Sequence, residues 1–198
     1  MRSCYFLLRS KLQKDYIFKI KLFKSWFYCP ANNFKLGVNG YLYSHREKYE
    51  ISLGHYFTLK PESYFWDIGA NIGFYNVFQL SQKNIFVRSV EPDKENFSIL
   101  KKNLNQWKKN KVGNIKTFNL GLGYKEEKLS ILSTNNDSGS LFLSNKLDSS
   151  KNQVKVTTLD KLIQLTGDKK VDFLRLMLRA WNIILVELRK RLRSINPK

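Results

Sequence analysis

The residues best suited to chemistry lie where an apolar run meets a glycine-containing loop. Residues 64–68 are apolar or aromatic except for Asp67, and Gly69 and Gly73 follow before the apolar pattern resumes. This order is typical of a buried strand, a tight loop and a helix N-terminus, where backbone N–H groups can bind a ligand. The G-x-x-x-G spacing matches neither the dinucleotide fingerprint nor the P-loop, so the loop alone does not identify its ligand.

Two further polar residues end the next predicted strands. Glu91 ends the second strand, and Asn119 ends the third. In an open α/β sheet the ligand binds beyond the carboxyl ends of the strands, where an acidic residue can accept hydrogen bonds from both ribose hydroxyls. Three strand ends lining one crevice therefore predict a site for a nucleoside-bearing cofactor. The alternative is that Asp67 and Glu91 are ordinary helix-capping or turn acids.

The elements that must position these residues alternate along the chain. We expect strands at 64–68, 85–91, 115–120 and 171–177, helices at 72–80, from Pro92 to about 107 and at 159–163, and hairpins over 125–157. In the helix after Pro92, an apolar stripe is formed by Phe97, Leu100, Leu104 and Trp107. Strands that alternate with helices predict an α/β fold with a parallel sheet and right-handed crossovers.

Residues 1–29 alternate bulky apolar side chains with lysines. Six of the apolar residues are spaced three or four apart, which predicts one face of a helix: Leu8, Leu12, Tyr16, Ile20, Phe23 and Phe27. Such a helix could pack on the domain, or it could lie on an anionic membrane surface. We therefore divide the chain into a basic amphipathic segment (1–45), the α/β domain (46–176) and a divergent basic tail (177–198).

Composition limits the class of protein. A chain of 198 residues with 42% hydrophobic residues is long enough for one folded domain, and its net charge is +19. The charge is explained either by a solvated basic surface or by attraction to anionic lipid, polysaccharide or nucleic acid. Cys4 and Cys29 form no disulfide framework or zinc motif, and no apolar stretch reaches the roughly 20 residues of a membrane helix. We expect a cytoplasmic protein without a metal site, with peripheral membrane contact as an option.

Four segments, taken in order, carry a resemblance to a known family. They are W-D-I-G-A-N-I-G-F-Y at 66–75, V-E-P at 90–92, V-T-T-L-D at 156–160 and V-D-F-L at 171–174. Over about residues 50–176 the chain resembles the FkbM-type family of S-adenosylmethionine-dependent methyltransferases. The resemblance implies a class I methyltransferase fold with a Rossmann-like parallel sheet, S-adenosylmethionine as cofactor, and O-methylation of a hydroxyl on a sugar or other metabolite.

The resemblance also implies a role for each site residue. Asp67, Gly69, Asn71 and Gly73 would surround the methionine part of the cofactor. Glu91 would bind the ribose, and Asn119 would lie near the adenine. The acceptor would be a small molecule or a saccharide. No catalytic residue is assigned.

The fourth predicted strand departs from the family pattern. Members of the family usually read like K-I-D-V-E-G-x-E there, and these acidic residues face the site of methyl transfer. This chain reads R-L-M-L-R-A-W-N, so Met177, Arg179 and Asn182 occupy the acidic positions. Methionine and arginine cannot remove a proton from a hydroxyl at neutral pH. We therefore expect little or no transferase activity and, since the chain ends at Lys198, an incomplete sheet.

A one-base change of reading frame near residues 175–177 would explain these departures. Codons read in the shifted frame can encode Asp-Val-Glu-Gly-Leu-Glu in place of residues 177–182, and five of the nine arginines fall in the last 24 positions. The alternative is a diverged family member with a different loop after the fourth strand. The coding DNA distinguishes the two.

Two other classes of function remain open. The charge of +19, with aromatic residues interleaved among lysines, suggests a nucleic-acid-binding or RNA-modifying protein, although no recognised binding motif is present. The other class is a non-catalytic module that binds the cofactor or a membrane surface without turnover. Salt-dependent retention of DNA or RNA would favour the first of these.

Overall fold

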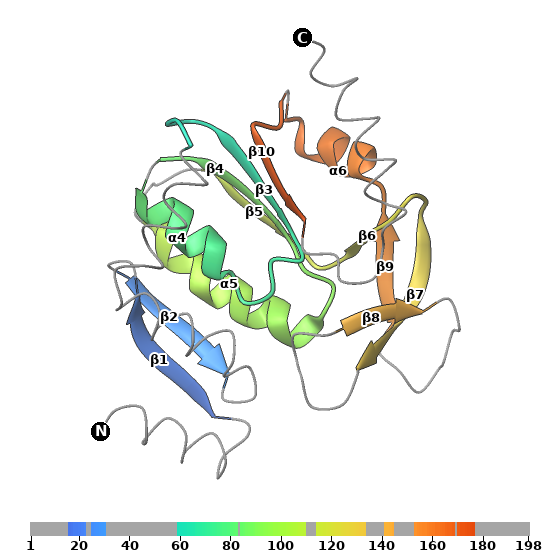
Figure 1. Ribbon diagram of the computed structural model, residues 1–198, viewed down its shortest axis with the longest axis horizontal. Helices are drawn as coiled ribbons and strands as arrows, with labels where there is room; N and C mark the ends of the chain where they lie inside the picture. The colour runs from blue at the N-terminus through green and yellow to red at the C-terminus, as the bar shows by residue number, and fades with distance from the viewer. Residues whose placement is uncertain are drawn as a thin grey trace.

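The computed structural model describes residues 16–22, 25–30, 59–82, 84–109, 114–133, 141–144, 153–168 and 170–176. These residues form a hairpin, two four-stranded sheets and three helices (Figure 1). The predicted tail and the predicted boundary near residue 45 lie outside this part of the chain.

The central sheet is parallel and has the strand order β10-β3-β4-β5. Its strands are β3 (Tyr64–Ile68), β4 (Phe86–Val90), β5 (Ile115–Phe118) and β10 (Phe173–Leu176). Helix α4 (Phe74–Gln82) connects β3 to β4, and helix α5 (Lys94–Lys109) connects β4 to β5. The predicted parallel α/β sheet of the Rossmann-like type is therefore confirmed.

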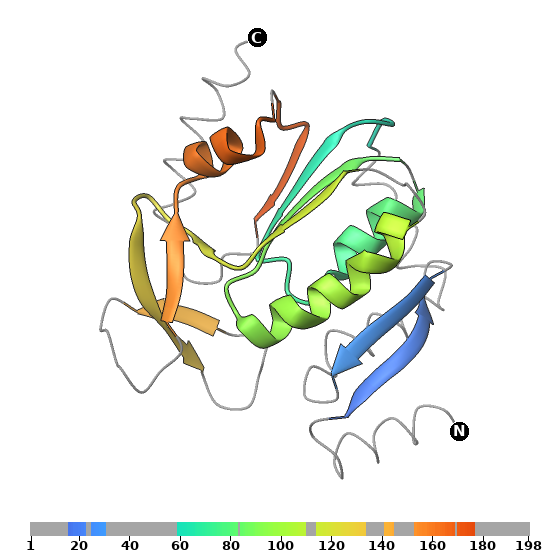
Figure 2. The same cartoon turned by 180° about the vertical axis from the view of Figure 1, so that it is seen from behind.

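Each face of the central sheet packs against helices (Figures 1 and 2). On one face, Phe65 and Val87 belong to a core that includes Leu100 and Leu104 of α5. Leu100, Leu104 and Trp107 of the predicted stripe are buried and Phe97 is half-buried, which confirms that part of the pattern. Strand residues alternate between faces, so the next residue, Trp66, enters the second core.

The second core packs against helix α6 (Leu159–Thr166), whose Leu159 and Leu162 are buried. The helix begins after Thr158, whose side-chain oxygen accepts a hydrogen bond from the Lys161 N–H, and it ends at Gly167 in the left-handed conformation. The predicted helix at 159–163 is thus confirmed and continues to Thr166.

A second sheet follows β5. Its order is β6-β9-β7-β8, from β6 (Gly121–Leu122), β9 (Gln153–Thr157), β7 (Glu127–Ser133) and β8 (Leu141–Ser144). Strand β7 is antiparallel to β8 and β9, which confirms the hairpins predicted over 125–157. The third strand, predicted at 115–120, ends two residues earlier, because the chain leaves the central sheet after Phe118 and enters the second sheet at Gly121.

The helix predicted near the N-terminus is wrong for the residues that the structure describes. Residues 17–30 contain an antiparallel hairpin of β1 (Ile17–Leu22) and β2 (Ser25–Pro30). Its side chains follow a period of two, since Phe18, Ile20, Phe27 and Cys29 are buried. Leu8, Leu12 and Phe23 of the predicted helical face lie outside the described residues.

Side-chain amides of α5 attach the hairpin to the domain. Asn103 accepts a hydrogen bond from the Tyr28 N–H at 2.6 Å and donates to the Tyr28 carbonyl at 3.0 Å. Gln106 donates to the Trp26 carbonyl at 2.5 Å. The buried residues of the hairpin belong to the same hydrophobic core as Leu100 and Leu104 of α5. The apolar face of the hairpin is therefore packed on the domain and is not available to a membrane surface. Among the described residues, no helix is long and apolar enough to cross a membrane.

Candidate functional site

The loop after β3 folds over the end of β4. Gly69 and Gly73 have φ angles of +77° and +88°, in the region that favours glycine, and Asn71 has a φ of +51°. The Gly69 and Ala70 N–H groups both donate to the Val90 carbonyl, at 2.9 and 3.0 Å. The Gly73 N–H donates to the Ala70 carbonyl at 2.9 Å. These three backbone N–H groups of the loop are thus used within the protein in this conformation.

Gly73 has a packing role as well as a conformational one. A Cβ atom at this position would lie 2.7 Å from Leu100 Cδ1, closer than side chains tolerate. The missing side chain therefore lets the start of α4 approach α5. The family resemblance implies that Gly73 lies next to the cofactor, and the close approach of Leu100 gives a separate physical reason for a glycine here.

Glu91 follows β4 and is buried, with 4% of its surface exposed. Its two carboxylate oxygens accept hydrogen bonds from the Asn71 N–H at 2.7 Å and the Asp93 N–H at 3.0 Å. Burial raises the pKa of the Glu91 carboxyl to about 7, although these two hydrogen bonds lower it. The carboxylate thus links the loop after β3 to the turn before α5.

Asn119 lies where the chain leaves β5, next to Glu91. Its side-chain amide donates to the carbonyls of Glu91 and Pro92, at 2.9 and 3.0 Å, and the Glu91 N–H donates to the Phe118 carbonyl. The structure therefore brings the ends of β4 and β5 together, as the sequence predicts. Asn119 is exposed, whereas Glu91 is buried.

Asp67 is fully buried, and each of its oxygens has a partner. Asn76 of α4 donates to Oδ2 at 2.7 Å, and Arg175 of β10 donates to Oδ1 at 2.6 Å. Ser89 of β4 donates to the Asn76 side-chain oxygen at 3.0 Å. Burial raises the pKa of the Asp67 carboxyl, while Arg175 and Asn76 lower it. The Asp67 carboxylate therefore faces other side chains of the protein.

Sequence reasoning did not identify Arg175 as part of the site. The arginine lies beside Asp67 in the parallel register of β10 and β3, and its guanidinium carbon lies 3.8 Å from the centre of the Tyr75 ring. Residues 173–176 are apolar except for Arg175, and this charge is the sequence feature that could have revealed it, because a buried charge requires a partner.

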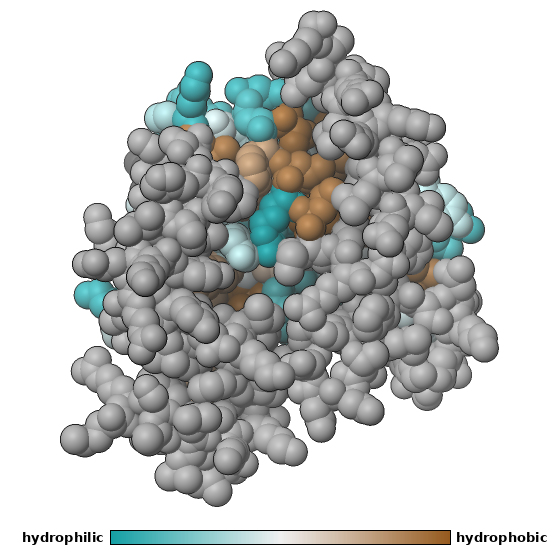
Figure 3. Space-filling view, in the orientation of Figure 1, coloured by the Kyte–Doolittle hydropathy of each residue, from teal (hydrophilic) through white to brown (hydrophobic). Residues whose placement is uncertain are grey.

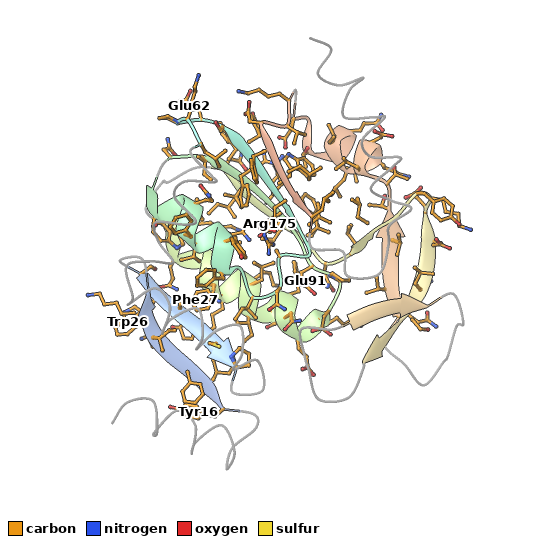
Figure 4. The ribbon with its side chains drawn as sticks, in the orientation of Figure 1. Tyr16, Trp26, Phe27, Glu62, Glu91 and Arg175 are labelled. Atoms are coloured by element: carbon orange, nitrogen blue, oxygen red, sulfur yellow. The ribbon has the colours of Figure 1, made fainter. Side chains whose placement is uncertain are left out.

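The polar groups meet at the carboxyl ends of the central strands. Figure 4 labels Arg175 and Glu91 near the ends of β3 and β4. In the same orientation, Figure 3 shows hydrophilic surface beside an apolar patch in the area of the Arg175 label. The donors and acceptors fit an adenosyl cofactor in kind. They include the carboxylate of Glu91, the exposed amide of Asn119 beyond β5 and the guanidinium of Arg175. A carboxylate at this place in an open α/β sheet can accept hydrogen bonds from ribose hydroxyls.

Comparison with known proteins agrees with this geometry. A family model described as the methyltransferase FkbM domain matches residues 67–176, which is more than half of the chain. The matched region begins at Asp67, ends with β10 and includes Glu91, Asn119 and Arg175. A search of curated proteins finds no match. This chain belongs to the methyltransferase FkbM domain family.

Proposed function

We propose that this chain binds S-adenosylmethionine at the carboxyl ends of β3, β4 and β5. Membership of the methyltransferase family supports a cofactor of this kind. The observation that carries the proposal is the position of Glu91, a buried carboxylate beyond β4 that lies between the loop after β3 and Asn119. An acidic residue at this point of an open α/β sheet is suited to ribose hydroxyls.

Each residue has a distinct task in this proposal. Glu91 accepts hydrogen bonds from the ribose, and Asn119 lies beside the adenine. Gly69 and Asn71 shape the loop over the cofactor, and Gly73 lets that loop continue into a closely packed helix. The bound cofactor supplies an activated methyl group.

We further propose that the acceptor is a hydroxyl of a sugar or other metabolite, because of the resemblance to FkbM-type enzymes. A hydroxyl oxygen attacks a methyl group efficiently only when a base removes its proton. Met177, Arg179 and Asn182, where the family pattern has acidic residues, supply no such base. These three residues lie outside the described part of the chain. We therefore propose that this sequence binds the cofactor but transfers its methyl group poorly.

Calorimetric titration of S-adenosylmethionine into the full chain tests the cofactor proposal. We expect one binding site per chain, and we expect Glu91→Ala to weaken binding at least tenfold. Glu95→Ala is the matched control, because it removes an exposed glutamate from the first turn of α5. A folded wild-type chain that binds no S-adenosylmethionine would refute the proposal, as would equal weakening by the two variants.

An assay for transfer of an isotope-labelled methyl group tests the proposal that this chain transfers the methyl group poorly. We expect cofactor binding without substantial methylation of sugar or metabolite hydroxyls. Robust methylation by the 198-residue chain would contradict the proposed impairment while leaving the cofactor proposal intact. Codons for residues 178–180 that cannot encode Val-Glu-Gly in the shifted frame would exclude the reading-frame hypothesis.

A further inference from the structure

We propose that Arg175 binds the carboxylate of the methionine part of S-adenosylmethionine, and that Asp67 is a positioning residue that orients Arg175. The inference rests on the proposed function and names a cofactor contact that the sequence motifs do not assign. It also gives a role to Asp67, whose carboxylate is enclosed by protein side chains.

The exposures of the two partners differ in the direction that this role requires. The Arg175 side chain is 13% exposed, whereas that of Asp67 is 0% exposed. A ligand that reaches this ion pair from solvent therefore meets the guanidinium before it meets the carboxylate. Within the described residues, Asp67 is the only hydrogen-bond partner of the Arg175 side chain. A guanidinium has five N–H donors, so Arg175 retains donors for a second carboxylate.

The guanidinium is held in place before any ligand arrives. Its Nη1 donates to Asp67 at 2.6 Å, and the Tyr75 ring lies 3.8 Å from its central carbon. Asn76 and Ser89 complete the row of hydrogen bonds that fixes the Asp67 carboxylate. A planar, pre-oriented guanidinium in a mostly buried position suits bidentate binding of a carboxylate.

The order of the strands matches the order of groups along the cofactor. Across the sheet, Arg175 on β10 is followed by β3, then by Glu91 after β4 and Asn119 after β5. Neighbouring strands lie roughly 4.8 Å apart, so Arg175 and Glu91 are separated by roughly 10 Å across the sheet. An extended S-adenosylmethionine presents its methionine carboxylate, its ribose and its adenine in this sequence. The methionine end thus falls on the β10 side, where Arg175 lies.

Two ligands that differ in the methionine part test the inference. S-adenosylhomocysteine has the amino-acid carboxylate, and 5′-methylthioadenosine lacks it. We expect the wild-type chain to bind S-adenosylhomocysteine more tightly, and Arg175→Met to reduce that preference at least tenfold. The dissociation constant for 5′-methylthioadenosine should change less than threefold. Lys170→Met is the matched control, since it removes an exposed cation at the opposite end of β10 and should leave both affinities unchanged.

A second set of variants keeps the test decisive if Arg175→Met does not fold. The combination of Asp67→Asn with Arg175→Met leaves no unpaired buried carboxylate, and it should lose the same preference. Asp67→Asn alone should reduce the preference partially and leave 5′-methylthioadenosine binding unchanged. Equal weakening of both ligands would show a purely structural ion pair and would overturn the inference, as would an unchanged preference. A wild-type chain that binds neither ligand would instead refute the proposed function itself, and the inference with it.

Discussion

The Asn71 backbone N–H donates to Glu91 Oε2 at 2.7 Å, and this bond joins the loop after β3 to the end of β4. The loop that carries the family's glycines is therefore held by the carboxylate that we assign to the cofactor ribose. Because Glu91 is buried, its protonation state affects both the stability of the domain and the surroundings of this loop.

Stability should depend on pH through Glu91. Its pKa rises from 4.5 to about 7 on folding, so the folded protein binds the proton more readily than the unfolded chain. This contribution to the free energy of unfolding is fully present below pH 4.5 and is lost as the pH rises to 7, by roughly 3 kcal/mol. The pKa of Asp67 is also raised on folding, so this group too makes the protein less stable as the pH rises.

Urea unfolding between pH 4.5 and 8 measures this effect. We expect Glu91→Gln to show a smaller fall in stability over this range than the wild type, with part of the fall remaining because of Asp67. Glu95→Gln, at an exposed position, should follow the wild-type curve. If the free energy of unfolding fell equally with pH in the wild type and in Glu91→Gln, this would contradict a raised pKa at Glu91.

The buried ion pair between Arg88 and Asp168 should be important for stability. Two guanidinium nitrogens of Arg88 donate to the two carboxylate oxygens of Asp168, each at 2.6 Å, and both side chains are almost fully buried. Removing one partner leaves a buried charge unpaired, so Arg88→Met should lower the free energy of unfolding by about 3–5 kcal/mol. Combining it with Asp168→Leu should recover most of the loss.

Urea unfolding of the two single variants and the double variant checks this coupling. Lys161→Met is the control, because it removes an ion pair between two half-exposed side chains, Lys161 and Glu126, and should change stability little. If the double variant loses as much unfolding free energy as the two single variants together, the two residues are not coupled.

Replacing Gly73 should destabilise the protein more than replacing Gly167. Both have positive φ, but only at Gly73 would an added Cβ meet another atom, Leu100 Cδ1 at 2.7 Å. We expect Gly167→Ala to cost about 1–2 kcal/mol of unfolding free energy, and Gly73→Ala about 2–5 kcal/mol. Thermal unfolding and urea titration measure the difference. Combining Gly73→Ala with Leu100→Ala should cost less than the sum of the single changes, and strict additivity would exclude the proposed clash.

Asn103 should determine whether the N-terminal hairpin stays attached to α5. Its side chain makes hydrogen bonds to the Tyr28 N–H, the Tyr28 carbonyl and the Ile72 carbonyl. Asn103→Ala should therefore lower the free energy of unfolding by about 2–4 kcal/mol. Hydrogen exchange at the Tyr28 amide should accelerate more than exchange within β4. Gln106→Ala is the milder comparison, and equal exchange rates at Tyr28 in wild type and Asn103→Ala would contradict this role.

The central sheet was predictable because its strands are short apolar runs that alternate with helices. Glu91 and Asn119 could be placed together for the same reason, since carboxyl ends of parallel strands meet at one edge. The register in which neighbouring strands pair could not be predicted from the local sequence. The pairing of Arg175 with Asp67 joins residues 108 positions apart, and only the alignment of β10 with β3 reveals it.

The hairpin at residues 17–30 was mispredicted for a related reason. Tyr16, Ile20 and Phe27 fit a helical spacing, while Phe18 and Ile20 also fit the alternation of a strand. The local sequence does not decide between these patterns. The contacts that favour the strand come from Asn103 and Gln106, at least 75 residues away, so tertiary structure determines the outcome.

Hydrogen exchange of the full chain with and without S-adenosylhomocysteine tests the central proposal most directly. We expect the ligand to slow amide exchange at three strand ends, residues 67–73, 89–93 and 117–121, and to leave residues 127–133 of the second sheet unchanged. Glu91→Ala should abolish this protection at the same ligand concentration. A folded wild-type chain whose exchange does not change with ligand, or changes only outside these three segments, would contradict a cofactor site at the carboxyl ends of β3, β4 and β5.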